Sequence, residues 1–137
     1  MPRRLKMPNQ ESVKKTHLTT SNIKYLIGLW ELGAADKGVR SIELAKRMDT
    51  SKPSTHAMVL NLCEKGLAVK DKNAQLHLTT EGAELAQQYA RCYSSVTNRL
   101  EYFLKLTHAD CRDAACSILA QVQERLPEFE AALPELQ

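Results

Sequence analysis

Apolar side chains recur at helical spacing in two short stretches of the chain, and a polar break separates the stretches. The first stretch, SIELAKRM, covers residues 41–48. The second follows Lys52 and has apolar positions at Met58, Val59, Leu62 and Cys63. Spacings of three and four residues predict an amphipathic helix in each stretch. Two helices separated by about four residues form a helix-turn-helix.

End signals place the second helix at residues 53–65. Ser51 offers an N-cap oxygen just before it, and Pro53 fits the first turn, where its missing N–H is no loss. Gly66 suits the position directly after the helix, where a left-handed conformation is common. The sequence therefore predicts both ends of a recognition helix.

A small β-hairpin is predicted next. Apolar residues alternate on both sides of a polar tip at residues 70–75, at Leu67, Val69, Leu76 and Leu78. A helix-turn-helix followed by such a hairpin is a winged helix.

Further helices are predicted on both sides of this unit. One begins after an N-cap at Thr20 or Ser21. A long one covers residues 81–106 and would extend about 39 Å. Another begins at residue 109 or 110 and continues through Leu126, and Pro127 opens a last short helix. The predicted fold class is mainly α, a winged helix-turn-helix at residues 18–80 followed by a helical dimerisation region at 81–137, with residues 1–17 as a basic flexible arm.

Charge separates the two parts of the chain. Residues 1–80 contain 14 Lys or Arg against 7 Asp or Glu, whereas residues 81–137 contain 5 against 9. A basic N-terminal part suits contact with phosphates, and a merely solvated surface is the alternative. The arm at residues 1–17 either contacts DNA or has no role of its own.

The start of the recognition helix carries short side chains that can approach base edges. Residues expected to read bases are Pro53, Ser54, Thr55, His56 and Ala57. Residues expected to contact phosphates are Ser51, Lys52, Asn61 and, at the wing tip, Lys70, Lys72 and Asn73. For His56, contact with a guanine and a position on phosphate are both open. The partner predicted by these residues is double-stranded DNA.

Other classes of function find less support in the sequence. No apolar run approaches the ~18 residues of a membrane helix, and the N-terminus has no apolar segment after its charges, so we expect a cytoplasmic protein with no membrane partner. There is no glycine-rich phosphate loop and no nucleophile with a placed base, so we expect no enzyme. The alternative function, from a different class, is a winged-helix module that binds a protein partner.

The four cysteines, Cys63, Cys92, Cys111 and Cys116, include no CxxC pair, and a disulfide framework is not expected. Cys92, Cys111, Cys116 and His108 could form a soft-metal set. Cys111 and Cys116 are five residues apart, about 140° around a helix, so they do not share a face. Simple packing, a redox switch and metal binding are the three interpretations of these thiols.

The pattern from about residue 18 to 126 resembles the diphtheria-toxin-repressor family of iron- and manganese-dependent repressors. The segments that carry the resemblance are YLIGLWEL, SIELAKRM, SKPSTHAMVLNLCEKGL, LHLTTEGAELA and DAAC. Multiple-antibiotic-resistance regulators share the layout with looser similarity. The resemblance implies a homodimer on a palindromic operator and a transition-metal cofactor (Mn, Fe or Zn). The chain resembles the short, manganese-type members, for which no SH3-like domain is expected.

The family's ligand pattern is largely missing from this chain. Ungapped alignment places Lys24 at the ligand position of the first helix and Cys116 at the Cys position. The remaining ligand positions fall on Leu119, Ala120, Tyr93 and Thr97. One thiolate cannot hold a divalent ion, and Lys24 places a positive charge that would repel a metal or stand in for it. The sequence thus predicts a dimeric DNA-binding regulator, most simply a repressor, with a degenerate metal site or a thiol-based sensor.

Overall fold

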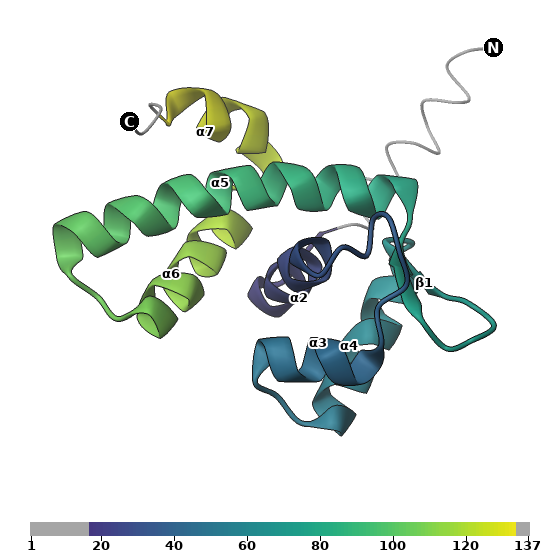
Figure 1. Cartoon of the computed structure of the whole chain (residues 1–137). Helices are drawn as coiled ribbons and strands as arrows, with labels where there is room; N and C mark the ends of the chain where they lie inside the picture. The colour runs from purple at the N-terminus through teal and green to yellow at the C-terminus, as the bar shows by residue number, and fades with distance from the viewer. Residues whose placement is uncertain (1–16, 134–137) are drawn as a thin grey trace, which may run out of the picture.

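The computed structural model describes residues 17–133, so all of the arm predicted at residues 1–17 except its last residue lies outside the described residues. Helices dominate, and one two-stranded sheet completes the fold (Figure 1). In chain order the elements are α2 (Thr20–Glu31), α3 (Ser41–Met48), α4 (Lys52–Glu64), β1 (Ala68–Lys70), β2 (Leu76–Leu78), α5 (Thr80–Leu104), α6 (His108–Gln121), η1 (Gln123–Arg125) and α7 (Leu126–Ala132). This confirms the predicted fold class of a mainly α winged helix-turn-helix followed by a helical region.

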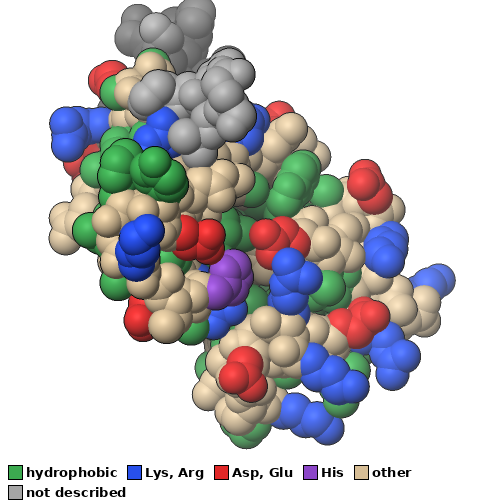
Figure 2. All heavy atoms as spheres, turned by 60° about the vertical axis from the view of Figure 1, so that its left-hand side comes forward, with side chains coloured by type: hydrophobic (Ala, Val, Ile, Leu, Met, Phe, Trp, Pro, Cys, Tyr) green, Lys and Arg blue, Asp and Glu red, His purple; other side chains and the backbone are tan. Residues whose placement is uncertain are grey.

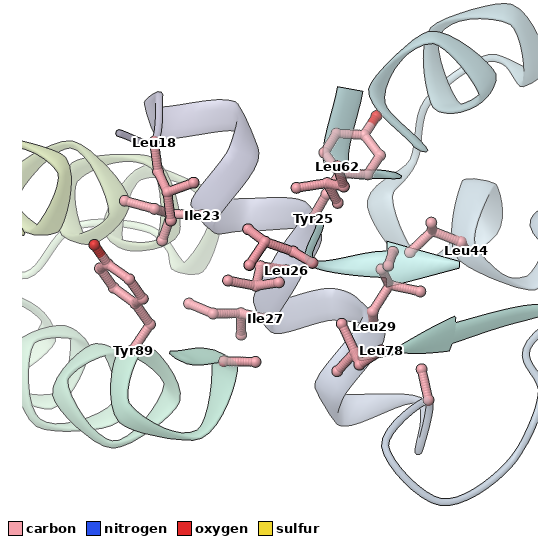
Figure 3. Close-up of a cluster of buried hydrophobic side chains, with 14 of the residues drawn as sticks. Leu18, Ile23, Tyr25, Leu26, Ile27, Leu29, Leu44, Leu62, Leu78 and Tyr89 are labelled. Carbon is pink, nitrogen blue, oxygen red and sulfur yellow. The ribbon is translucent and has the colours of Figure 1, made fainter. Parts of the chain in front are cut away.

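Helix α2 lies at the centre of the hydrophobic core. It starts at a capping box, in which Thr19 and Asn22 each accept a hydrogen bond from the other's backbone N–H, at 3.0 Å. Its buried side chains point in two directions (Figure 3). Ile23 faces Tyr89 of α5, while Leu29 lies toward Leu44 of α3. The same helix therefore packs against the helix-turn-helix and against the C-terminal helices.

The helix-turn-helix forms where the periodicity predicted it. The turn after α3 contains Asp49 in the left-handed conformation, at φ 55°, and the N–H of Thr50 bonds to the Ala45 carbonyl at 3.0 Å. The Ser51 side chain accepts a hydrogen bond from the Ser54 N–H at 3.2 Å, which confirms the predicted cap of α4.

The wing differs from the prediction on one strand. Strands β1 and β2 are antiparallel, with Ala68 opposite Leu78, and Val39 adds an isolated bridge to Leu76. Val69 was predicted to share an alternating apolar pattern with Leu67, but its side chain is 47% exposed, and Ala68 is buried instead. The first strand is only three residues long, and Leu67 precedes it, so strict alternation does not apply there.

The C-terminal helices are shorter than predicted. Helix α5 ends at Leu104, two residues early, because Lys105 adopts the left-handed conformation at φ 56°. Helix α6 begins at His108, after an N-cap at Thr107, and ends at Gln121. The chain up to residue 126 was predicted as one helix, but α6 ends at Gln121 and a short 3-10 turn separates it from α7. Pro127 lies in the first turn of α7, where its missing N–H is no loss.

A side-chain clamp joins the two ends of the described chain. The Gln123 amide accepts a hydrogen bond from the Leu18 N–H and donates one to the Leu18 carbonyl, both at 2.7 Å. Figure 1 shows α5 running across the molecule, with α7 on one side of it and the helix-turn-helix and wing on the other. Among the described residues, no helix is both long enough and apolar enough to cross a membrane.

Candidate nucleic-acid interface

The N-cap and the first two turns of α4 present a row of exposed side chains. Its exposed members are Ser51, Lys52, Pro53, Ser54, His56 and Ala57. Backbone N–H groups at a helix start lack partners within the helix, so they and the helix dipole favour a nearby anion such as a phosphate. Six of the seven predicted side chains between residues 51 and 57 are thus placed where a duplex can reach them.

Thr55 corrects the prediction for this turn. Only 1% of the residue is exposed, so its side chain cannot contact a base edge as predicted. Its hydroxyl lies 2.9 Å from the Thr50 hydroxyl, which accepts a hydrogen bond from the Tyr25 hydroxyl at 2.9 Å. This chain of hydroxyls joins α2, the turn and α4, and it fixes the angle at which α4 leaves the turn.

Replacing Thr55 by valine should therefore affect folding and leave base preference unchanged. The substitution keeps the shape and removes one hydrogen bond in a buried network, which should lower the free energy of unfolding by about 0.5–1.5 kcal/mol. Urea unfolding would measure this, with Thr55→Ser as the control that retains the hydroxyl. A change in sequence preference with unchanged stability would contradict the structural role.

The Asn61 side chain also forms a hydrogen bond within the fold. Its side-chain oxygen accepts a hydrogen bond from the Asn22 amide at 2.8 Å, so the predicted phosphate contact competes with a bond that holds α4 to α2.

Leu60 was not predicted as a site residue, yet it is 48% exposed. It lies one turn after His56 on the exposed face of α4, where a leucine can pack on a thymine methyl. Its spacing of four from His56 was the signal that could have found it.

The wing tip is braced by a single carboxylate. Asp71 accepts hydrogen bonds from the backbone N–H groups of Asn73 at 2.8 Å and Gln75 at 3.0 Å, and its other oxygen lies 2.7 Å from His77 Nε2. The bonds from the Gln75 backbone and then from His77 lower the pKa of Asp71. Lys70, Lys72 and Asn73 are all exposed on this braced loop. The wing therefore presents two cations in a defined place.

The exposed start of α4 and the exposed wing tip lie on the same side of α5 (Figure 1). Figure 2 shows several Lys and Arg side chains gathered on the lower part of the face drawn there. Contacts from both a recognition helix and a wing fix the register of a protein on a duplex, and base contacts then select the sequence.

The positions aligned with family metal ligands lie between α2, α5 and α6. The Lys24 ammonium lies 2.9 Å from an Asp113 carboxylate oxygen, which ties α2 to α6. Thr97 donates its hydroxyl to the Tyr93 carbonyl at 2.9 Å, and Leu119 is fully buried in the core. Within residues 17–133, no group of three His, Cys, Asp or Glu side chains could hold a metal ion. The residues present do not fit a divalent cation.

The thiols are placed as core groups. Cys92, Cys111 and Cys116 are buried, and Cys63 is half-buried. Burial raises the pKa of Cys92 to about 11 and that of Cys116 to about 12, so these thiols are protonated at neutral pH. The exposed His108 lies 3.3 Å from a Glu101 oxygen instead of joining a cysteine set. Packing is the interpretation that these positions favour.

Comparisons with known proteins identify the class of fold. Neither a protein-family model nor a curated protein matches the sequence. Among solved structures, the manganese regulator SloR shares 29% identity with a TM-score of 0.60, over 84% of this chain and 55% of that one. IdeR from T. acidophilum shares 16% identity with a TM-score of 0.57, over 79% and 51%. The hypothetical protein SSo2273 from Sulfolobus solfataricus shares 16% with a TM-score of 0.53, over 85% and 92%.

The likeness to SloR covers most of this chain, and the fold is that of winged-helix regulators. The chain spans about half the length of SloR and IdeR. The comparisons therefore show the winged-helix fold.

Proposed function

We propose that this chain is a homodimeric transcriptional regulator that represses by binding a palindromic operator, and that it is not an enzyme. The observation that carries the proposal is the pairing of an exposed, polar first turn of α4 with two exposed lysines on a braced wing. The likeness to SloR supports it. Residues 18–80 would hold the DNA, and residues 81–137 would join the two copies.

We infer that DNA binding by this regulator needs no metal. SloR is a manganese regulator. Here the Lys24–Asp113 pair joins α2 and α6 directly, as a bridging ion would, and Cys116 is a buried thiol beside it. The positions of these groups support a lost or replaced metal response. A thiol sensor is less favoured, because three of the four described cysteines are buried.

The test is a shift assay with the full chain on DNA from upstream of its own gene. Equal binding with EDTA and with added Mn²⁺ is the expected result, because the protein's own ion pair joins the helices. A scrambled duplex of the same length is the control for specificity. Loss of binding in EDTA that Mn²⁺ restores would contradict metal-independent binding.

The C-terminal end of α5 supports the proposed dimer. Tyr102 and Phe103 are 73% and 71% exposed, and Leu104 is also exposed. The two rings contact each other edge to face, with centroids 4.9 Å apart. Three adjacent large apolar side chains on a surface indicate an interaction site. A second copy of the chain is the proposed occupant, because a palindromic operator needs two recognition helices at a fixed spacing.

Replacing Phe103 by aspartate should convert the dimer to a monomer. A charge in an apolar interface loses its hydration without a partner, so dimerisation should weaken at least 100-fold. Analytical ultracentrifugation would measure it, with Ser117→Asp on α6 as the control for an exposed position in the same region. An unchanged dimer in the Phe103 variant would place the interface elsewhere.

A further inference from the structure

A cavity of about 310 Å³ lies between the helix-turn-helix and the C-terminal helices. Four helices, α2, α3, α5 and α6, contribute to its wall. The lining residues are Lys24, Ile27, Gly28, Glu31, Arg47, Met48, Tyr93, His108, Arg112 and Cys116. Figure 2 shows a histidine with acidic and basic side chains around it on the face where α6 comes forward. The volume is at the lower end of the range for small-molecule sites.

Three of the four basic side chains in this wall have carboxylate partners. Lys24 pairs with Asp113 at 2.9 Å, and His108 lies 3.3 Å from Glu101. Arg47 forms an ion pair with Glu31. These pairs leave the charges of Lys24 and Arg47 compensated within the protein.

Arg112 is the exception. Within residues 17–133 no carboxylate forms an ion pair with it. Its Nε atom is buried and has no hydrogen-bond partner in the described part of the chain. A buried donor without an acceptor is costly, so the described residues leave this half-buried guanidinium incompletely satisfied. Because the Nε atom is closed to solvent, a ligand in the cavity would bind the other two guanidinium nitrogens. Asp113 interacts electrostatically with Arg112 but forms its ion pair with Lys24, so the Arg112 guanidinium can accept an anionic ligand.

One part of the wall is apolar. Ile27, Gly28 and Met48 form the side toward α2 and α3, and the Tyr93 side chain lies on the α5 side. Inorganic anions gain nothing from such a surface, whereas an organic acid would bury its carbon skeleton there. A guanidinium binds a carboxylate through two parallel hydrogen bonds.

We propose that this cavity binds a small organic monocarboxylate, with its carboxylate on Arg112 and its apolar body against Ile27 and Met48. Met48 and Arg47 belong to α3, whereas Arg112 belongs to α6. A bound acid therefore joins the helix-turn-helix to the C-terminal helices and acts as an effector. The effector role rests on the proposed function, while binding itself does not.

Benzoate is the probe, and isothermal titration calorimetry with the full chain measures its binding. We expect one benzoate per chain in the wild type, and at least about tenfold weaker binding in Arg112→Gln, because a charge-assisted bond is lost. Arg125→Gln removes an equal charge from an exposed site and should bind as the wild type does. Benzamide, a neutral analogue, and inorganic phosphate should bind far more weakly. Equal binding of benzamide, or of the Arg112 variant, would overturn the proposal.

A second measurement does not depend on the stability of that variant. Benzoate should shift one arginine Nε–H resonance of the wild-type protein in ¹H–¹⁵N spectra, and Arg112→Lys should remove that resonance. The absence of any such shift at saturating benzoate would also overturn the site.

The effector role has its own test in the shift assay. Saturating benzoate should change the affinity for the upstream duplex by about fivefold or more, and benzamide should not. Benzoate binding with unchanged DNA affinity would overturn only the effector role. Failure to bind DNA with or without benzoate would contradict the proposed function and leave the calorimetric result intact.

Discussion

The double substitution Lys52→Ala and Lys72→Ala should weaken binding to every duplex by roughly 30-fold, on the basis of about 1 kcal/mol per lost phosphate contact. Both side chains are exposed, one at the start of α4 and the other at the wing tip. Each phosphate contact releases counterions, so the slope of log affinity against log salt should fall by about 1.8 for the two together. Fluorescence anisotropy at several salt concentrations would measure both quantities.

A matched control removes the same charge elsewhere. Lys37→Ala with Arg125→Ala changes two exposed cations outside the proposed interface, and it should leave both affinity and slope within twofold of the wild type. Ser54→Ala, by contrast, should alter which duplex is preferred while keeping the salt slope. If the two double variants weaken binding equally, net charge alone would explain the effect, and the assignment of α4 and the wing would be wrong.

The second large effect is expected at Gly82, in the first turn of α5. A Cβ atom at this position would lie 1.9 Å from the Leu67 carbonyl oxygen, which is backbone and cannot rotate away. The same carbonyl accepts a hydrogen bond from the Thr79 N–H at 3.1 Å. Gly82→Ala should therefore lower the free energy of unfolding by about 3 kcal/mol, the upper part of the usual range for overpacking.

Urea or thermal unfolding of the purified variant would measure this loss. Gly66→Ala is a useful comparison, because Gly66 has a φ of 78° but an added Cβ would meet only Glu81 Oε1, at 4.0 Å. That change costs only the strain of a left-handed alanine, about 1–2 kcal/mol. If Gly82→Ala proves no more destabilising than Gly66→Ala, the close contact between α5 and the Leu67 backbone would be contradicted.

The sequence predicted the helix-turn-helix well because its end signals are local. Ser51 and Gly66 lie within a residue or two of the helix ends that they mark. The burial of Thr55 was missed, although it lies four residues before Val59 and seven before Leu62, on the same helical face. Short polar residues at the start of a recognition helix favour an interpretation as DNA contacts. The helical spacing of Thr55 from Val59 and Leu62 indicated instead that its side chain lies in the core.

Other features depend on contacts between distant parts of the chain. The bond from Asn22 to Asn61 joins residues 39 apart, and no local pattern indicates it. The Val39 bridge to Leu76 and the pairing of Lys24 with Asp113 are of the same kind. The cavity around Arg112 also needs four helices in place before it exists. Local periodicity carries no information about contacts between residues so far apart in the sequence.

The two-sided packing of α2 has a consequence for how such regulators diversify. Ile23 faces α5 and Leu29 lies toward α3, so helices of another protein in place of residues 81–133 would not match the half of α2 that now packs against α5 and α6. A working chimera would have to carry α2 residues matched to the new helices. Exchange of the C-terminal helices therefore requires coordinated change in α2, and simple recombination of the two parts should give poorly folded products.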